Sequence, residues 1–144
     1  LALLHYLETL KGVLPISHHI VMLNTAIPEK TTGNSCSYIE IAIPPERYED
    51  VRNRALVFIQ DESLSPEWGM AFRRGFSIPG TFRIFGSKAR SGVVDEKEAE
   101  AVAAKNGVEL FGGRGRIGAL AAIALSGLPH EILLRPFAPI PPGS

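Results

Sequence analysis

The sequence has little cysteine and no excess of charge of either sign. Cys36 is the single cysteine among 144 residues, which excludes an internal disulfide and a zinc site built from cysteines. Fifteen basic residues balance fifteen acidic ones, so no overall field directs the chain to nucleic acid, and any basic surface must be local. No apolar run approaches the roughly 20 residues of a membrane-spanning helix. A lone cysteine fits a reducing compartment, so we expect a cytoplasmic protein without a membrane partner.

The length and composition predict one domain with a core of its own. Hydrophobic residues make up 45% and charged residues 21% of the sequence, as in an ordinary globular protein. Residues 136–144 are rich in proline, which cannot continue a helix or a central strand. We therefore expect a single α+β domain over residues 1–135 and a proline-rich tail or linker over 136–144. The apolar start without methionine leads us to expect that the chain begins partway through a larger gene product.

Apolar periodicity predicts an alternation of helices and strands. Helices are expected over residues 1–12, 45–60, 81–94, 95–107 and 116–126, and strands over 19–24, 37–43, 68–72, 108–111 and 131–135. Residues 81–94 could also alternate as a strand, and the helix is the interpretation we favour. Asp95 is expected to cap the fourth helix, because Glu98 stands at the capping-box position. The early α-β-β-α-β order predicts a ferredoxin-like α/β sandwich, with extra helices packed on a mixed or antiparallel sheet.

A glycine-rich turn stands between a predicted strand and a predicted helix. It comprises Gly112-Gly113-Arg114-Gly115-Arg116-Ile117-Gly118. Glycines leave backbone N–H groups unshielded, and the positive end of the following helix lies at the same place, so the turn predicts an anion site. The predicted phosphate contacts are Gly113, Arg114, Gly115, Arg116 and Gly118.

Two other interpretations of this turn stay open. The spacing Gly113-x-Gly115-x-x-Gly118 matches the dinucleotide fingerprint of nicotinamide and flavin oxidoreductases, but the acid expected at the end of the next strand is missing. Small alanines after the turn also fit a purely structural role, in which Gly118 lets the helix pack closely on a sheet. Anion binding is the interpretation we favour.

Three other polar groups could take part in a site. The segment 28–34 offers Lys30, Thr31, Thr32 and Asn34, which are groups that hold phosphate or ribose, although hairpin loops have the same composition. The neighbouring carboxylates Asp61 and Glu62 lie in a predicted loop and could hold Mg²⁺ or an amine, or could simply be solvated. Arg73 and Arg74 follow a predicted strand and could meet an anion.

Two of these segments together resemble a known family, the archaeal agmatidine synthases, or tRNA-isoleucine agmatinylcytidine synthetases. The segment Leu23-Asn24…Pro28-Glu29-Lys30-Thr31-Thr32-Gly33-Asn34 resembles one part of these enzymes, and residues 113–123 resemble a second, in the same order. The resemblance implies an ATP-dependent ligase or kinase with ATP and Mg²⁺ as cofactors and with tRNA and agmatine as partners. Such enzymes phosphorylate a wobble cytidine, and agmatine then displaces the phosphate.

The resemblance also implies roles for the candidate residues. The glycine-rich turn would hold a phosphate, while Lys30 and Asp61 would be catalytic and Thr31, Thr32, Asn34 and Glu62 would contact substrate. Thr32 departs from the arginine that the family tends to have at its position. The family's aspartate-rich metal loop is not among these residues, and no residue is assigned as a metal ligand. The alternative is therefore a nucleotide- or RNA-binding module that kept the fold without catalysis.

Overall fold

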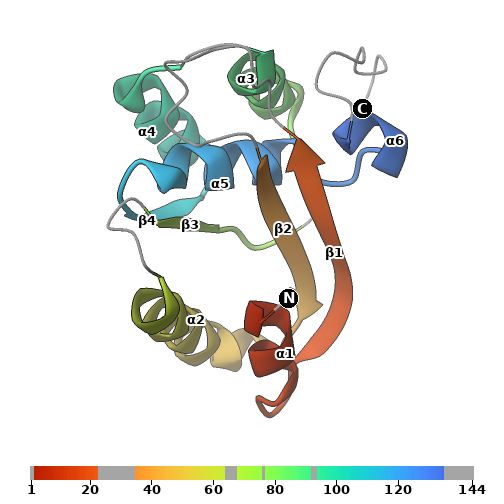
Figure 1. Ribbon diagram of the computed structural model, residues 1–144, viewed down its shortest axis with the longest axis vertical. Coiled ribbons are helices and arrows are strands. Elements are labelled where there is room, and N and C mark those ends of the chain that lie inside the picture. The colour runs from red at the N-terminus through yellow and green to blue at the C-terminus, as the bar shows by residue number, and fades with distance from the viewer. Residues whose placement is uncertain (1, 23–34, 64–67, 76, 92–93, 135–144) are drawn as a thin grey trace.

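The chain folds as helices packed around two antiparallel strand pairs, which is an α+β fold (Figure 1). The computed structural model describes residues 2–22, 35–63, 68–75, 77–91 and 94–134. The elements are α1 (Ala2–Glu8), β1 (Leu14–Met22), β2 (Ser35–Ala42), the short 3-10 helix η1 (Pro45–Arg47), α2 (Tyr48–Glu62), β3 (Gly69–Phe72), α3 (Gly80–Ser91), α4 (Glu96–Lys105), β4 (Glu109–Gly112), α5 (Gly115–Ala124) and α6 (His130–Leu133). The predicted α+β class is confirmed.

The long hairpin β1–β2 forms one strand pair and packs on α5 and α6. Its register places His19 opposite Tyr38 and Val21 opposite Cys36, with an irregularity between Pro15 and Ser17. Buried residues of this end of the hairpin join apolar residues of α5 and α6 in one cluster, made of Val21, Tyr38, Ala122, Leu125, Leu128 and Leu133. The predicted antiparallel pairing is confirmed, although β1 begins at residue 14 instead of 19.

The second pair, β3–β4, lies between α5 and α2. Its register places Gly69 opposite Gly112 and Phe72 opposite Glu109. Because side chains alternate along a strand, Gly69 and Ala71 face α5, while Met70 and Phe72 face the other way. Both Met70 and Phe72 pack against a cluster of α1 and α2 residues that includes Leu7, Val51 and Ala55. Figure 1 shows α5 on one side of this pair and α2 on the other.

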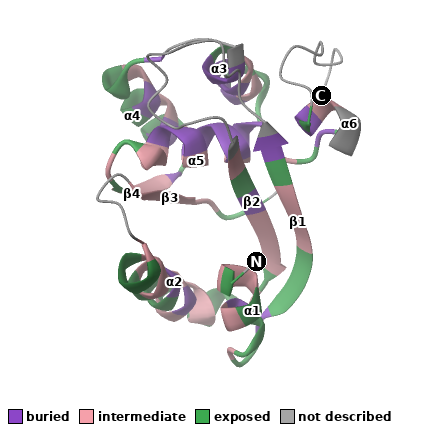
Figure 2. Cartoon of the chain, viewed as in Figure 1, coloured by how far each residue is buried: buried purple, intermediate pink, exposed green. Residues whose placement is uncertain are grey.

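Helix α5 is the element that most of the core contacts. It is buried along most of its length (Figure 2). Besides its contacts with the hairpin, α5 supplies residues to the main cluster, made of Phe82, Phe85, Ala89, Val94, Ala99, Ala103, Val108, Ile117, Leu120, Ala121 and Ala124. Arg83 of α3 binds the C-terminal end of α5, since its Nη1 donates to the carbonyls of Ala124 at 3.1 Å and Ser126 at 2.8 Å. This end of α5 is therefore held by α3.

Two sequence predictions about elements are wrong. Residues 131–135 are predicted as a strand, but His130–Leu133 forms a helical turn in which the amides of Ile132 and Leu133 donate to the carbonyl of Pro129 at 3.0 and 3.1 Å. A proline suits the start of a helix, and a short apolar run does not by itself separate helix from strand. Asp61 and Glu62, predicted in a loop, form the last turn of α2.

None of the helices in the described part of the chain combines the length and the apolar character that a bilayer crossing requires.

The close approach of β3 to α5 gives a stability prediction at Gly69. An ideal Cβ on Gly69 would lie 1.9 Å from the backbone nitrogen of Arg116 and 2.2 Å from the carbonyl carbon of Gly115. We expect Gly69→Ala to lower the free energy of unfolding by about 3 kcal/mol, because only backbone shifts could make room. Urea denaturation measures the change.

The matched control is Gly80→Ala at the start of α3. A Cβ there meets no heavy atom within 4 Å. Alanine should raise the free energy of unfolding by about 0.4–1 kcal/mol, because it restricts the unfolded chain. Equal urea midpoints for the two variants would contradict the tight contact at Gly69.

Candidate functional site

The glycine-rich turn joins β4 to α5 and is closed by the residue before β3. Gly112 ends β4 with φ of +95°, a conformation that favours glycine. An ideal Cβ on Gly112 would also lie 2.3 Å from the carbonyl oxygen of Trp68. The amide of Gly113 donates to that same oxygen at 2.7 Å. Gly112 is therefore required here both by its backbone angle and by the nearness of Trp68.

The first turn of α5 begins directly after these glycines. Arg114 occupies the N-cap position, and no side chain caps the helix there. The amides of Arg116 and Ile117 donate to the carbonyls of Gly113 at 3.1 Å and Arg114 at 3.2 Å, which tightens the turn. Gly118 is buried one turn further on. The predicted phosphate contacts, residues 113–118, thus lie together at the positive end of a buried helix.

Arg116 connects this turn to α4. Its Nη2 lies 3.2 Å from a carboxylate oxygen of Glu96 and 3.2 Å from one of Glu100, and its Nη1 donates to the carbonyl of Gly113 at 3.1 Å. The side chain is only 20% exposed. The two carboxylates balance the charges of Arg114 and Arg116, so the turn carries no net side-chain charge. A phosphate would have to displace Glu96 and Glu100 to reach the guanidinium of Arg116.

Of the other predicted site residues, the structure describes only Asp61 and Glu62, which belong to α2 and not to this turn. Lys30, Thr31, Thr32 and Asn34 lie outside the described residues. Glu62 is exposed at the end of α2.

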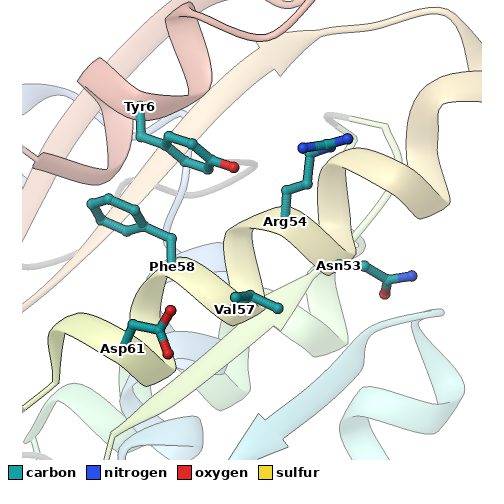
Figure 3. A pocket seen from close by; sticks show the side chains of 6 residues that line it. All are labelled: Tyr6, Asn53, Arg54, Val57, Phe58 and Asp61. Carbon is teal, nitrogen blue, oxygen red and sulfur yellow. The ribbon is translucent and has the colours of Figure 1, made fainter.

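Asp61 lines a shallow groove between α1 and α2, together with Tyr6, Asn53, Arg54, Val57 and Phe58 (Figure 3). The rings of Tyr6 and Phe58 stack there with centroids 4.9 Å apart. No group of three histidine, cysteine or acidic side chains in the described ranges could hold a metal ion.

A second polar cluster lies at the end of β3–β4 away from the glycine-rich turn. The hydroxyl of Tyr48 donates to Glu109, and Nη1 of Arg52 lies 2.7 Å from the other carboxylate oxygen of Glu109. The guanidinium carbon of Arg74 stands 4.0 Å from the centroid of the Tyr48 ring. Sequence reasoning marks Arg74 only as the second of two arginines after a strand. It misses Tyr48 and Glu109, because 61 residues separate them and no local pattern joins them.

The environment of Tyr48 keeps its hydroxyl protonated. Burial, followed by the hydrogen bond to the Glu109 carboxylate and the negative charge of that group, raises the pKa of Tyr48 to about 12. The positive charges of Arg52 and Arg74 act in the other direction. Tyr48 is therefore a fixed hydrogen-bond donor at neutral pH, and its ring is held in place.

Comparison with known sequences gives two relatives and no matching family model. The sequence is 33% identical over 125 residues to TiaS of Pyrococcus horikoshii, a 2-agmatinylcytidine synthetase that acts on an isoleucine tRNA, across 79% of this chain and 29% of that protein. It is 27% identical over 121 residues to an uncharacterized protein of Methanocaldococcus jannaschii, across 84% of this chain and 40% of that one. The chain spans less than half the length of either relative.

Two solved structures share the fold of this chain. One is the crystal structure of a complex of TiaS with an isoleucine tRNA and ATP, at a TM-score of 0.71 and 23% identity. The other is a tRNA fluorescent labeling enzyme, at a TM-score of 0.63 and 23% identity. In both cases the match covers 85% of this chain and 30% of the solved chain. The α+β arrangement described above is therefore common to all three.

The raised pKa of Tyr48 predicts a pH dependence of stability. A pKa that rises from its usual 10.0 to about 12 on folding adds stability below pH 10, and this stability is lost as the pH rises toward 12. Absorbance titration of the phenolate should show one tyrosine titrating near pH 12, absent in Tyr48→Phe. Glu109→Gln should lower this pKa toward 10, and an unchanged titration in that variant would contradict the assigned hydrogen bond.

Proposed function

Because this chain belongs to the TiaS-related family, as a partial or smaller relative, we propose that it performs an ATP-dependent phosphoryl transfer of the agmatidine-synthase type. In this proposal a tRNA wobble cytidine is activated and coupled to agmatine. The observation that supports it is the glycine-rich turn at the start of α5, which places the positive end of a buried helix beside Arg114. The relative that acts on an isoleucine tRNA supports tRNA as a partner, and the similar fold of a TiaS complex with tRNA and ATP supports the nucleotide.

The turn can hold a phosphate with groups of the right kind. The amides of Gly113, Arg116 and Ile117 already donate to backbone carbonyls, so a phosphate would meet the positive end of the helix and the guanidinium of Arg114. Arg114 is exposed at the N-cap position, where its guanidinium can reach an incoming oxygen. Arg116 would contact the phosphate by exchanging Glu96 and Glu100 for it. These are the groups that bind and orient ATP in this proposal.

The remaining predicted residues have unequal support. Lys30, Thr31, Thr32 and Asn34 are proposed to face the phosphate on the strength of the resemblance alone. Mg²⁺ fits Asp61 poorly, because among the described residues Asp61 belongs to no group of three histidine, cysteine or acidic side chains that could hold a metal ion. No step of the proposed reaction is assigned to the metal.

One observation favours a second function, which is nucleotide or RNA binding without catalysis. The carboxylates of Glu96 and Glu100 hold Arg116 and cancel the charge that would stabilise a transferring phosphoryl group. Incubation of the chain with ATP, with and without the isoleucine tRNA, separates the two functions. Formation of ADP that depends on tRNA supports transfer, whereas ATP binding without ADP formation supports the binding module.

Calorimetry with ATP and Mg²⁺ tests the phosphate site. We expect the wild-type chain to bind ATP and not NAD, and Arg114→Ala to weaken ATP binding about tenfold, as the loss of one charged contact does. Lys105→Ala is the control, since it removes an exposed cation from the far end of α4 and should leave the affinity unchanged. No ATP binding by the wild type, or equal affinity in Arg114→Ala, would overturn the proposal.

A further inference from the structure

Arg74 is an exposed cation stacked on an aromatic ring. It stands just beyond β3, and its guanidinium carbon lies 4.0 Å from the centroid of Tyr48. No carboxylate lies within ion-pair distance of it among the residues that the structure describes. The Tyr48 ring lies against one side of the guanidinium at this distance, and because Arg74 is exposed, its remaining side can receive a ligand.

The ring beneath Arg74 is held by a network that uses its hydroxyl. Glu109 accepts from Tyr48 and is paired with Arg52, whose side chain is only 17% exposed. The guanidinium carbon of Arg52 also lies 5.7 Å from the Tyr48 centroid. Glu109 and Arg52 thus hold Tyr48 in place without a ligand. A ligand that binds Arg74 does not have to order the Tyr48 ring.

The carboxylates near this platform pair with Arg52 and not with Arg74. Glu109 lies 2.7 Å and Glu49 3.8 Å from the guanidinium of Arg52. Arg73 is turned inward, with its Nε donating to the carbonyl of Asn106 at 3.0 Å and its guanidinium near the ring of Phe82. Arg74 is left as the cation that points outward at this end of the strand pair. This differs from Arg116, whose charge is cancelled by two carboxylates.

We propose that the outer face of Arg74 receives an unpaired base of a single-stranded RNA, with its N–H groups bound to the adjacent phosphate. Bases stack on guanidinium planes, and a charged N–H edge binds phosphate oxygens strongly. A paired base in a duplex keeps its faces covered by its neighbours, which is why the ligand is single-stranded. The inference rests on the proposed function, because it names where that tRNA-directed chain contacts RNA.

The platform is separate from the proposed ATP site. Gly69 at one end of β3 contacts the glycine-rich turn, and Arg74 follows the other end. The four residues of β3 span about 13 Å, so one strand of RNA could pass from the platform toward a nucleotide at the turn. The two contacts can therefore be tested independently.

The test measures fluorescence anisotropy of a short labelled single-stranded RNA of mixed sequence, with the same RNA in a duplex as comparison. We expect the wild-type chain to prefer the single strand, and Arg74→Ala to lose about tenfold in affinity and about 0.7 in the slope of log affinity against log salt. Arg74→Lys should keep the salt slope while recovering little of the affinity, because lysine has charge without a plane. Arg54→Ala removes an exposed arginine that pairs with Asp50 at 3.0 Å, and should change neither quantity.

Each outcome decides the proposal and leaves the ATP site to its own assay. Equal affinities of the Arg74→Ala and Arg54→Ala variants, or equal binding of duplex and single strand, would overturn the platform. Full recovery by Arg74→Lys would also overturn it, since stacking would then contribute nothing. ATP binding that persists in Arg74→Ala shows that the phosphate site stands even if the platform fails. If the chain binds RNA as expected but does not bind ATP, the proposed function is overturned and the platform is not.

Discussion

The contact between the start of β3 and the first turn of α5 is the constraint on which the rest of the structure depends. Gly69 lies so close to the backbone of Arg116 that no side chain fits between them, and the carbonyl of Trp68 fills the space beside Gly112. With Arg83 bound at its other end, α5 is fixed in position and supplies residues to two of the three apolar clusters. The glycine-rich turn therefore cannot move without disturbing the core, which gives any ligand there a preorganised surface.

The elements that could be predicted from the sequence are those whose signal is local. Asp95 accepts from the amide of Glu98 at 2.7 Å, as the capping box predicts, because four consecutive residues contain the whole motif. The β1–β2 hairpin follows from alternation in each strand, although its predicted start is too late. The last element is predicted wrongly because a short apolar run, such as the one containing the buried Leu133, fits a buried strand as well as a buried helix. Only its packing against the hairpin and α5 settles that choice.

In the candidate site, too, the features that could be predicted are those formed by neighbouring residues. The glycine-rich turn is predicted correctly between a strand and a helix, since glycine spacing and helix start are adjacent in sequence. The partners of Arg116 are not predicted, because Glu96 and Glu100 look only like the acidic first turns of a helix. The stack of Arg74 on Tyr48 needs β3 and α2 to be brought together, and no sequence spacing encodes that. The position of the turn can therefore be predicted from adjacent residues, whereas the charge pairs around it depend on the tertiary fold.

The neutral net charge of the chain makes the surroundings of each arginine important. A chain with no overall field cannot attract a polyanion from a distance, so RNA would have to be held by individual cations in specific places. The structure distinguishes two kinds of arginine on this basis. Arg116 is neutralised by carboxylates and gains charge only if a ligand displaces them, which costs part of the binding energy. Arg74 is backed by an uncharged ring and needs no such exchange.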